Sequence, residues 1–234
     1  EVPMRITLDP SYILHARHYR ESSLLLEGFS RSHGRVGLVA RGARGSRSRW
    51  KNVLQPFRPR LGSWNHRGER GTRTEADQVA SPPALAGPAL FCGLYANELL
   101  MQFLHRSDPH PTTFDHYRDM LAELAAGAAE QPLLRSFEMR LLEAAGFGMQ
   151  LDHEHGTRKS LSPDAIYVYL PESGPVPRES LPATNEEPVS GAALLALKSG
   201  KIGEQHLPEL KRLMRKLIRY YQGDREIKSH SLFS

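Results

Sequence analysis

Cysteine is almost absent from this sequence, which contains one, Cys92, among 234 residues. A single cysteine excludes an intrachain disulfide and a zinc site built from several thiolates. The sequence also lacks any run of 18 apolar residues, so it predicts no transmembrane helix. No secretory signal precedes the first strands. These absences together predict a cytoplasmic protein.

Motifs of catalysis are equally scarce. No serine lies in a GxSxG motif, and the sequence has neither a GxxxxGK[ST] phosphate loop nor a Rossmann fingerprint. Cys92 lies in an apolar helical run, which favours an inert core thiol over a nucleophile. The acid pairs Glu69/Glu75 and Glu186/Glu187 look like surface groups. We therefore expect a protein that is not an enzyme.

Positive charge, in contrast, is abundant and concentrated. The formal net charge is +5. The segment 31–73 alone carries a larger positive charge than the whole chain, because it contains a single acid, Glu69, and twelve basic residues. These are Arg31, Arg35, Arg41, Arg44, Arg47, Arg49, Lys51, Arg58, Arg60, Arg67, Arg70 and Arg73. Clustered charge of this kind favours binding to phosphates.

The first 80 residues have the pattern of a small β-domain. Short apolar or β-prone runs separated by glycines predict five strands, at Ser11–Arg17, Ser23–Phe29, Arg35–Ala40, Phe57–Trp64 and Thr72–Val79. Five short strands in this length are typical of a small closed barrel.

Residues 81–88 are rich in proline and break this pattern, so we place a domain boundary there. Apolar residues at helical spacing then predict helices at 89–105, 112–129, from 132 to about 146, and 204–221. Thr112 or Thr113 is expected to cap the second helix, and Pro132 to open the third. A strand at 166–170 and a short helix at 191–197 complete the pattern. The predicted fold is α+β, with a barrel domain (1–80) and a helical domain (81–234) that carries a polar, proline-rich insertion at about 152–190.

The segment Gly34–Lys51 is the strongest candidate for a binding site. A strand leads there into a glycine-rich basic loop, whose arginines and backbone amides suit phosphates and do not read bases. Trp50, Phe57 and Trp64 lie nearby in sequence. Aromatic side chains beside a basic groove stack on bases in barrel folds, although core packing is the more frequent role of each one taken singly.

Two further clusters have both a functional and a plain interpretation. Asp152, His153, Glu154 and His155 have the donor atoms for zinc, but no second spaced pair of ligands follows, and we favour a solvated polar loop. On the last helix, one face is apolar and the other is basic. That basic face either contacts DNA or acidic protein tails or is a solvated exterior, and it consists of Lys211, Arg212, Arg215, Lys216 and Arg219.

Several motifs, in order along nearly the whole chain, resemble one family. In the first domain these are HARHYRESSL (15–24), Phe29, Gly34-Arg-Val36, VARGAR (39–44) and LQPF (54–57). The second domain has GLYANELL (93–100), LRSFEMRLL (134–142), GFG (146–148) and KSHSLF (228–233). Together they resemble the RecO family of bacterial recombination mediators. Residues 152–190 are poorly covered by the resemblance.

The resemblance implies an oligonucleotide/oligosaccharide-binding (OB) barrel followed by a helical domain. It implies binding of single- and double-stranded DNA, annealing of complementary strands, and help in loading RecA onto DNA coated with single-stranded DNA-binding protein. The implied partners are RecR and the acidic tail of that protein. Many family members hold zinc through four cysteines after the third helix. Since this chain has none between Gly146 and Ser190, it resembles the zinc-free branch, and we expect no metal or other cofactor.

The resemblance also implies roles for particular residues. Arg135 matches a position that grips the acidic tail, where an arginine fork suits a carboxylate; the plain alternative is an exposed charge on a buried helix. The basic residues of the barrel are expected to hold DNA phosphates, and these are Arg35, Arg41, Arg44, Arg47, Arg49 and Lys51.

Three other functions remain open at this point. A metal-dependent nuclease would use the Asp152–His155 cluster. An RNA-binding module would use the same basic barrel. An adaptor would use its basic surfaces for acidic proteins alone.

Overall fold

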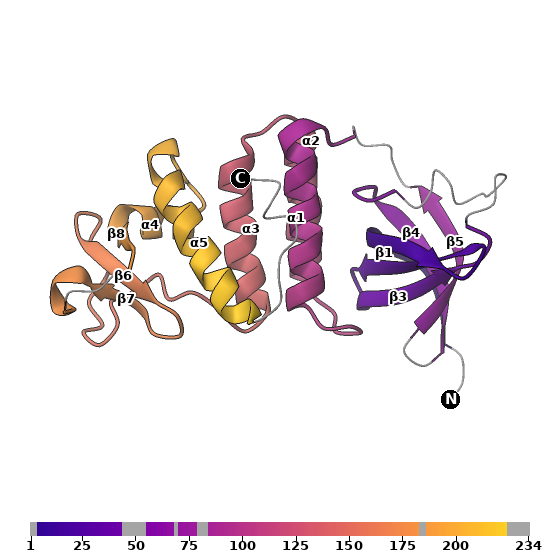
Figure 1. Ribbon diagram of the computed structural model, residues 1–234, viewed down its shortest axis with the longest axis horizontal. Coiled ribbons are helices and arrows are strands. Elements are labelled where there is room, and N and C mark those ends of the chain that lie inside the picture. Colours follow the sequence, from indigo (N-terminus) through magenta and orange to yellow (C-terminus); the bar gives the residue numbers. More distant parts are fainter. Residues whose placement is uncertain (1–3, 44–54, 68–69, 79–83, 183–185, 224–234) are drawn as a thin grey trace. The chain divides into compact units, whose positions relative to one another are not determined.

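A computed structural model of the chain describes residues 4–43, 55–67, 70–78, 84–182 and 186–223 (Figure 1). The amino-terminal part is a closed barrel with strand order β1-β2-β3-β5-β4, in which β3 and β5 run parallel and the other pairs are antiparallel. Its strands are β1 (Met4–Tyr19), β2 (Ser23–Ser30), β3 (Gly34–Ala40), β4 (Arg60–Arg67) and β5 (Arg70–Gln78). The predicted OB-type barrel is therefore confirmed.

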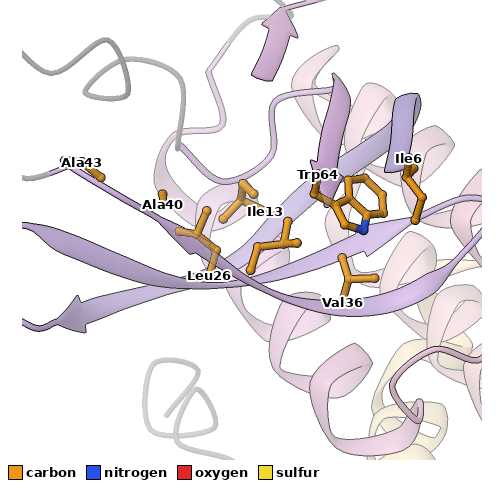
Figure 2. Close-up of a cluster of buried hydrophobic side chains, with 8 residues drawn as sticks. Ile6, Ile13, Leu26, Val36, Ala40, Ala43 and Trp64 are labelled. Carbon is orange, nitrogen blue, oxygen red and sulfur yellow. The ribbon is translucent and has the colours of Figure 1, made fainter. Parts of the chain in front are cut away.

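The barrel closes around a small apolar core, shown in Figure 2. Val36, Leu38 and Ala40, alternate residues of β3, belong to this core, as the two-residue period of a strand requires. Trp64 is the largest member of this core and is 1% exposed. The core consists of Ile6, Ile13, Leu26, Val36, Leu38, Ala40, Ala43 and Trp64.

Strand β1 is longer than predicted, and its pairing is interrupted twice. The register shifts between Ile6 and Asp9 against β4, and between Ile13 and His15 against β2. Leu8, at the first irregularity, has a φ of 53° and is 52% exposed. Each bulge shifts the pairing of the strand with its neighbour. The sequence did carry a strand signal here, because Met4, Ile6 and Leu8 alternate with polar residues, and the prediction missed it.

Helices α1 (Gly87–Phe103) and α2 (Pro111–Ala125) belong to the same compact unit as the barrel. Tyr12 and Phe29, on the outer face of β1 and β2, contact the rings of Phe114 and Tyr117 at centroid distances of 5.2–6.3 Å. Asn97 of α1 donates a 2.8 Å hydrogen bond to the carbonyl of Leu14. The barrel thus has two apolar faces, one lining its interior and one covered by helices.

The start of α2 differs from the prediction. His110 is the N-cap residue, its side chain makes no capping bond, and Pro111 opens the helix. Thr113 is buried instead of capping. A proline in the first turn has no backbone N–H to satisfy and has φ preset for a helix, which favours a helix start at this residue.

The second compact unit begins at Ala129 and contains α3 (Glu130–Ala144), α4 (Gly191–Ser199), α5 (Leu207–Gln222) and a small sheet of order β7-β6-β8. The strands are β6 (Ile166–Leu170), β7 (Gly174–Pro177) and β8 (Pro188–Ser190). The apolar face predicted for α5 is confirmed, since Leu210, Met214 and Leu217 are fully buried. Among the described residues, no helix has the length and apolar content to cross a membrane.

Candidate nucleic-acid interface

A hollow of about 670 Å³ lies at the turn between β1 and β2. Its lining is polar and comes from that turn and from the end of β3, with Tyr19, Arg20, Glu21, Ser22, Ser23, Val39 and Arg41 as its residues. The guanidinium carbon of Arg20 lies 5.2 Å from the centre of the Tyr19 ring, a cation–π contact that keeps an aromatic face beside a positive charge. Phosphates and bases are the ligands that such a pair suits.

The strand that leads into this turn is basic and exposed. His15, Arg17, His18 and Arg20 are all solvent-accessible. Sequence reasoning used residues 15–24 only as a family signature and did not assign these side chains to DNA. A signal was available, because residues 15–20 hold four basic side chains and no acid.

The predicted phosphate ligands fall into three groups. Arg41 is exposed at the hollow, as a DNA contact requires. Arg35 is turned inward, where its guanidinium donates hydrogen bonds to the carbonyls of Met101 and Leu104 and lies 3.3 Å from Glu27. Its described contacts therefore tie β3 to the end of α1. Arg44, Arg47, Arg49, Lys51 and the candidate base-stacking Trp50 lie outside the described residues.

The two described candidate aromatics pack inside the protein. Trp64 belongs to the barrel core. Phe57 is half-buried beside α1, where its ring lies so close to Gly93 that a Cβ there would come within 2.8 Å of it. The expectation that core packing outweighs stacking is confirmed for Trp64, whereas Phe57 packs on α1 with part of its ring exposed.

Arg60 is a buried cation that the sequence gave no reason to single out. It is 1% exposed, and its three guanidinium nitrogens have no hydrogen-bond partner among the residues that the structure describes. Burial, with Arg58 nearby as a second cause, lowers the pKa of Arg60 to about 10. An unpaired charge in such a place costs stability at neutral pH.

The basic face of α5 is partly neutralised within its own unit. Lys216 binds Glu186 and the carbonyl of Tyr169, and Arg212 lies 3.5 Å from Glu187. Lys211 is half-buried, while Arg215 and Arg219 are exposed. Both glutamates belong to the insertion, so part of this face holds the insertion in place.

Arg135 is buried, so the alternative that it is merely an exposed charge on a buried helix does not hold. It is 5% exposed, and its guanidinium lies 3.0 Å from the carboxylate of Glu138, one helical turn away, which is itself 1% exposed. A partner's carboxylate at this position would have to compete with Glu138 for the same guanidinium.

The Asp152–His155 cluster does not converge on one point. Asp152 pairs with Lys198, while the carboxylate of Glu154 accepts hydrogen bonds from Thr157 (2.6 Å) and Tyr167 (3.1 Å). Among the described residues, no group of three or more side chains is placed to hold a metal ion. Tyrosine hydroxyls fix this loop instead, as Ser162 and Gln150 donate their backbone N–H to Tyr167 and Tyr169.

Asp9, Ser30 and His33 lie together at the other end of the barrel, yet their geometry is not that of a catalytic triad. The Ser30 hydroxyl donates to Asp9, and the ring Nδ1 of His33 lies 3.4 Å from the Ser30 oxygen. Ser30 is completely buried. Its hydroxyl therefore cannot reach a substrate, and the cluster instead fixes the turn between β2 and β3.

Comparison with known proteins decides the family. Residues 4–81 match the family model "Recombination protein O N terminal", and residues 86–231 match "Recombination protein O C terminal". The chain belongs to the RecO family. Proteins named DNA repair protein RecO share 44% identity with it in Methylococcus capsulatus, 40% in an Azoarcus species and 44% in Alkalilimnicola ehrlichii. The alignments cover 97–99% of this chain and 91–95% of those relatives.

RecO membership confirms the resemblance found in the motifs and places the chain among proteins of DNA repair and recombination. The two family models meet between residues 81 and 86, at the proline-rich break. The compact units divide later, before Ala129, because α1 and α2 pack on the barrel. The family models therefore divide the chain at residues 81–86, whereas packing divides it at Ala129.

Proposed function

We propose that this RecO-family chain binds single- and double-stranded DNA through the basic end of its barrel. The protein then anneals complementary strands and helps to load RecA onto DNA that is coated with single-stranded DNA-binding protein. No covalent chemistry takes part. The proposal rests on the exposed basic side chains at the end of β1 and in the turn after it, which are His15, Arg17, His18 and Arg20. They lie beside the 670 Å³ hollow, which Arg41 also lines. Arg41 is also where the basic segment 41–51 begins.

Annealing follows from electrostatics in this account. Two DNA strands repel each other through their phosphates. A protein that neutralises phosphates on both strands lowers this repulsion and raises the local concentration of one strand near the other. Contacts to phosphates carry no sequence information, which suits a protein that acts on any complementary pair.

The proposed partners are RecR and the acidic tail of the single-stranded DNA-binding protein. For the tail we retain Arg135 as the proposed contact, with Glu138 as the group that the tail carboxylate displaces. The exposed Arg215 and Arg219 of α5 are the proposed secondary basic surface, with Lys211, Arg212 and Lys216 flanking them.

The salt dependence of binding tests the DNA-binding part directly. Each phosphate neutralised on a single strand contributes about 0.7 to the log–log slope of affinity against salt, so roughly five contacts predict a slope near −3.5 and about a hundredfold loss from 50 to 200 mM salt. Fluorescence anisotropy of a labelled oligonucleotide measures this slope. A flat response, or tighter binding of structured RNA than of DNA at matched salt, would contradict the proposal.

A further inference from the structure

We propose that the exposed face of α5 is a second binding site for single-stranded DNA, with one unpaired base stacked on Tyr220. The inference rests on the proposed DNA binding and adds to the barrel a site in the second compact unit. The site consists of a stripe of arginines along the helix and an aromatic cluster at its carboxyl end. One strand held there and its complement held at the barrel would give annealing a place for each strand.

The stripe is made by three exposed arginines of α5, namely Arg212, Arg215 and Arg219. They are spaced three and four residues apart, so they lie on one side of the helix over a length of about 10 Å. Among the described residues, no carboxylate pairs with Arg215 or Arg219. A row of cations about one helical turn apart is complementary to the regularly spaced phosphates of a nucleic acid strand.

An aromatic cluster stands at the carboxyl end of the stripe. The rings of Phe147 and Tyr221 are stacked with their centroids 4.4 Å apart, and Tyr220 meets Tyr221 edge to face at 5.1 Å. The Tyr220 side chain is 54% exposed, whereas Trp64 of the barrel is 1% exposed. Proteins that bind single strands stack bases on accessible aromatic rings beside positive charge. Tyr220 is therefore the ring on which a base can be held.

The cluster is fixed before any strand binds. Phe147 follows the turn that ends α3, and its backbone N–H donates a 2.8 Å hydrogen bond to the carbonyl of Leu142. The Tyr221 hydroxyl accepts a 2.8 Å hydrogen bond from the backbone N–H of Glu172, in the turn between β6 and β7. The Tyr220 hydroxyl donates to the carboxylate of the same Glu172 at 3.3 Å. A preformed platform reduces the ordering cost of binding.

The combination of stripe and ring selects an unpaired strand as the ligand. A duplex offers phosphates, but its bases are paired and stacked on one another, so none is available to Tyr220. An acidic peptide offers carboxylates to the arginines without a flat ring at each unit of its chain. A single strand has a phosphate and a flat ring in every nucleotide, and both kinds of contact contribute to its binding.

Two acids of the insertion already lie on this face. Glu187 lies 3.5 Å from Arg212, and Glu186 pairs with Lys216. The side chains of Glu187 and Arg212 are each at least half exposed, so water weakens their attraction. A phosphate therefore competes with Glu187 for Arg212, and removal of this carboxylate should strengthen DNA binding. A basic surface that served only to hold the insertion would not gain affinity for DNA in this way.

The test locates the contact directly, because the barrel is expected to bind DNA as well. The full chain with Arg41 and Arg44 replaced by glutamate (R41E/R44E) weakens the barrel site and serves as the background. Oligothymidine carrying one 5-iodouracil is photocrosslinked to it, and the crosslinked residue is identified by mass spectrometry. We expect a crosslink at Tyr220. Tyr220→Ala should abolish it and weaken binding about tenfold, the contribution of one stacked base, whereas Tyr220→Phe should keep the affinity of the background.

Charge variants test the stripe in the same background. R215E/R219E should weaken oligothymidine binding at least about tenfold and lower the magnitude of the salt slope by about 1.4. Glu187→Gln should strengthen binding about twofold. R158E/K201E, at exposed residues of the same unit, is the matched control and should leave the crosslink in place and the slope unchanged.

The possible outcomes separate this site from the proposed function. If no crosslink forms in the second unit, or if R215E/R219E and R158E/K201E have equal effects, the α5 site is wrong and binding at the barrel stands. An acidic peptide that binds this face while oligothymidine does not would assign it to a protein partner and overturn the site. No binding of oligothymidine by the unaltered chain at low salt would overturn the proposed function itself.

Discussion

Reversing the charges of Arg41 and Arg44 together (R41E/R44E) should weaken single-stranded DNA binding at least tenfold at about 0.1 M salt. Arg41 is exposed at the basic hollow, and Arg44 follows it in the basic segment. Losing two phosphate contacts lowers the magnitude of the salt slope by about 1.4, and the new carboxylates add repulsion. Anisotropy titrations at several salt concentrations measure both quantities.

The control for this double variant carries the same change in net charge elsewhere. Arg158 and Lys201 are exposed residues of the second unit, so R158E/K201E removes as much positive charge without touching the barrel. Its affinity for DNA should fall much less and its salt slope should stay unchanged. Both variants should unfold at the temperature of the parent protein. Equal losses in the two variants would show that net charge, and not the hollow, determines binding.

Replacing Gly34 by alanine should destabilise the barrel unit by at least about 3 kcal/mol. Gly34 has a φ of +66°, which disfavours any side chain, and a Cβ built there would overlap the carbonyl group of Asp108. Strain of the backbone alone costs about 1–2 kcal/mol. Displacing the backbone of the α1–α2 connection adds a further cost, because packed backbone cannot yield as a flexible side chain does.

Gly42 supplies the matched control. Its φ is +67°, almost the same, but no atom of the described part of the chain lies within 4 Å of a Cβ built there. Gly42→Ala should therefore lose only the strain of about 1–2 kcal/mol. Urea unfolding of the two variants gives the difference between strain and overlap. A similar small loss in both would mean that the close contact between Gly34 and Asp108 does not exist in solution.

The fold was largely predictable because its signals are local. Leu210, Met214 and Leu217 recur at helical spacing, and each of them is fully buried in α5. Gly146 ends the third helix as predicted, with a φ of +88° just past Ala144. The early start of β1 carried a local signal, the alternation of Met4, Ile6 and Leu8 with polar residues, that the prediction did not use. Its two register shifts were not predictable, since they depend on pairing with β4 and β2, which are distant in sequence.

The site was less predictable, because the partners of a charged side chain are a matter of tertiary structure. Arg35 and Arg41 look equivalent in the sequence, yet Arg35 donates to the end of α1 while Arg41 remains exposed. Likewise, no pattern in the sequence marks Arg60 as buried, or as lacking a hydrogen-bond partner within the described ranges. Composition identified the basic region, and only the fold separates its structural arginines from those available to DNA.

The central claim, that this RecO-family chain is a mediator, is tested most directly by annealing. Two complementary oligonucleotides are coated with single-stranded DNA-binding protein, either intact or without its acidic tail, and the rate of duplex formation is followed with and without this chain. We expect faster annealing on DNA coated with the intact protein, and loss of that effect when the tail is absent. Annealing of bare strands alone, or an equal rate with and without the tail, would contradict the claim.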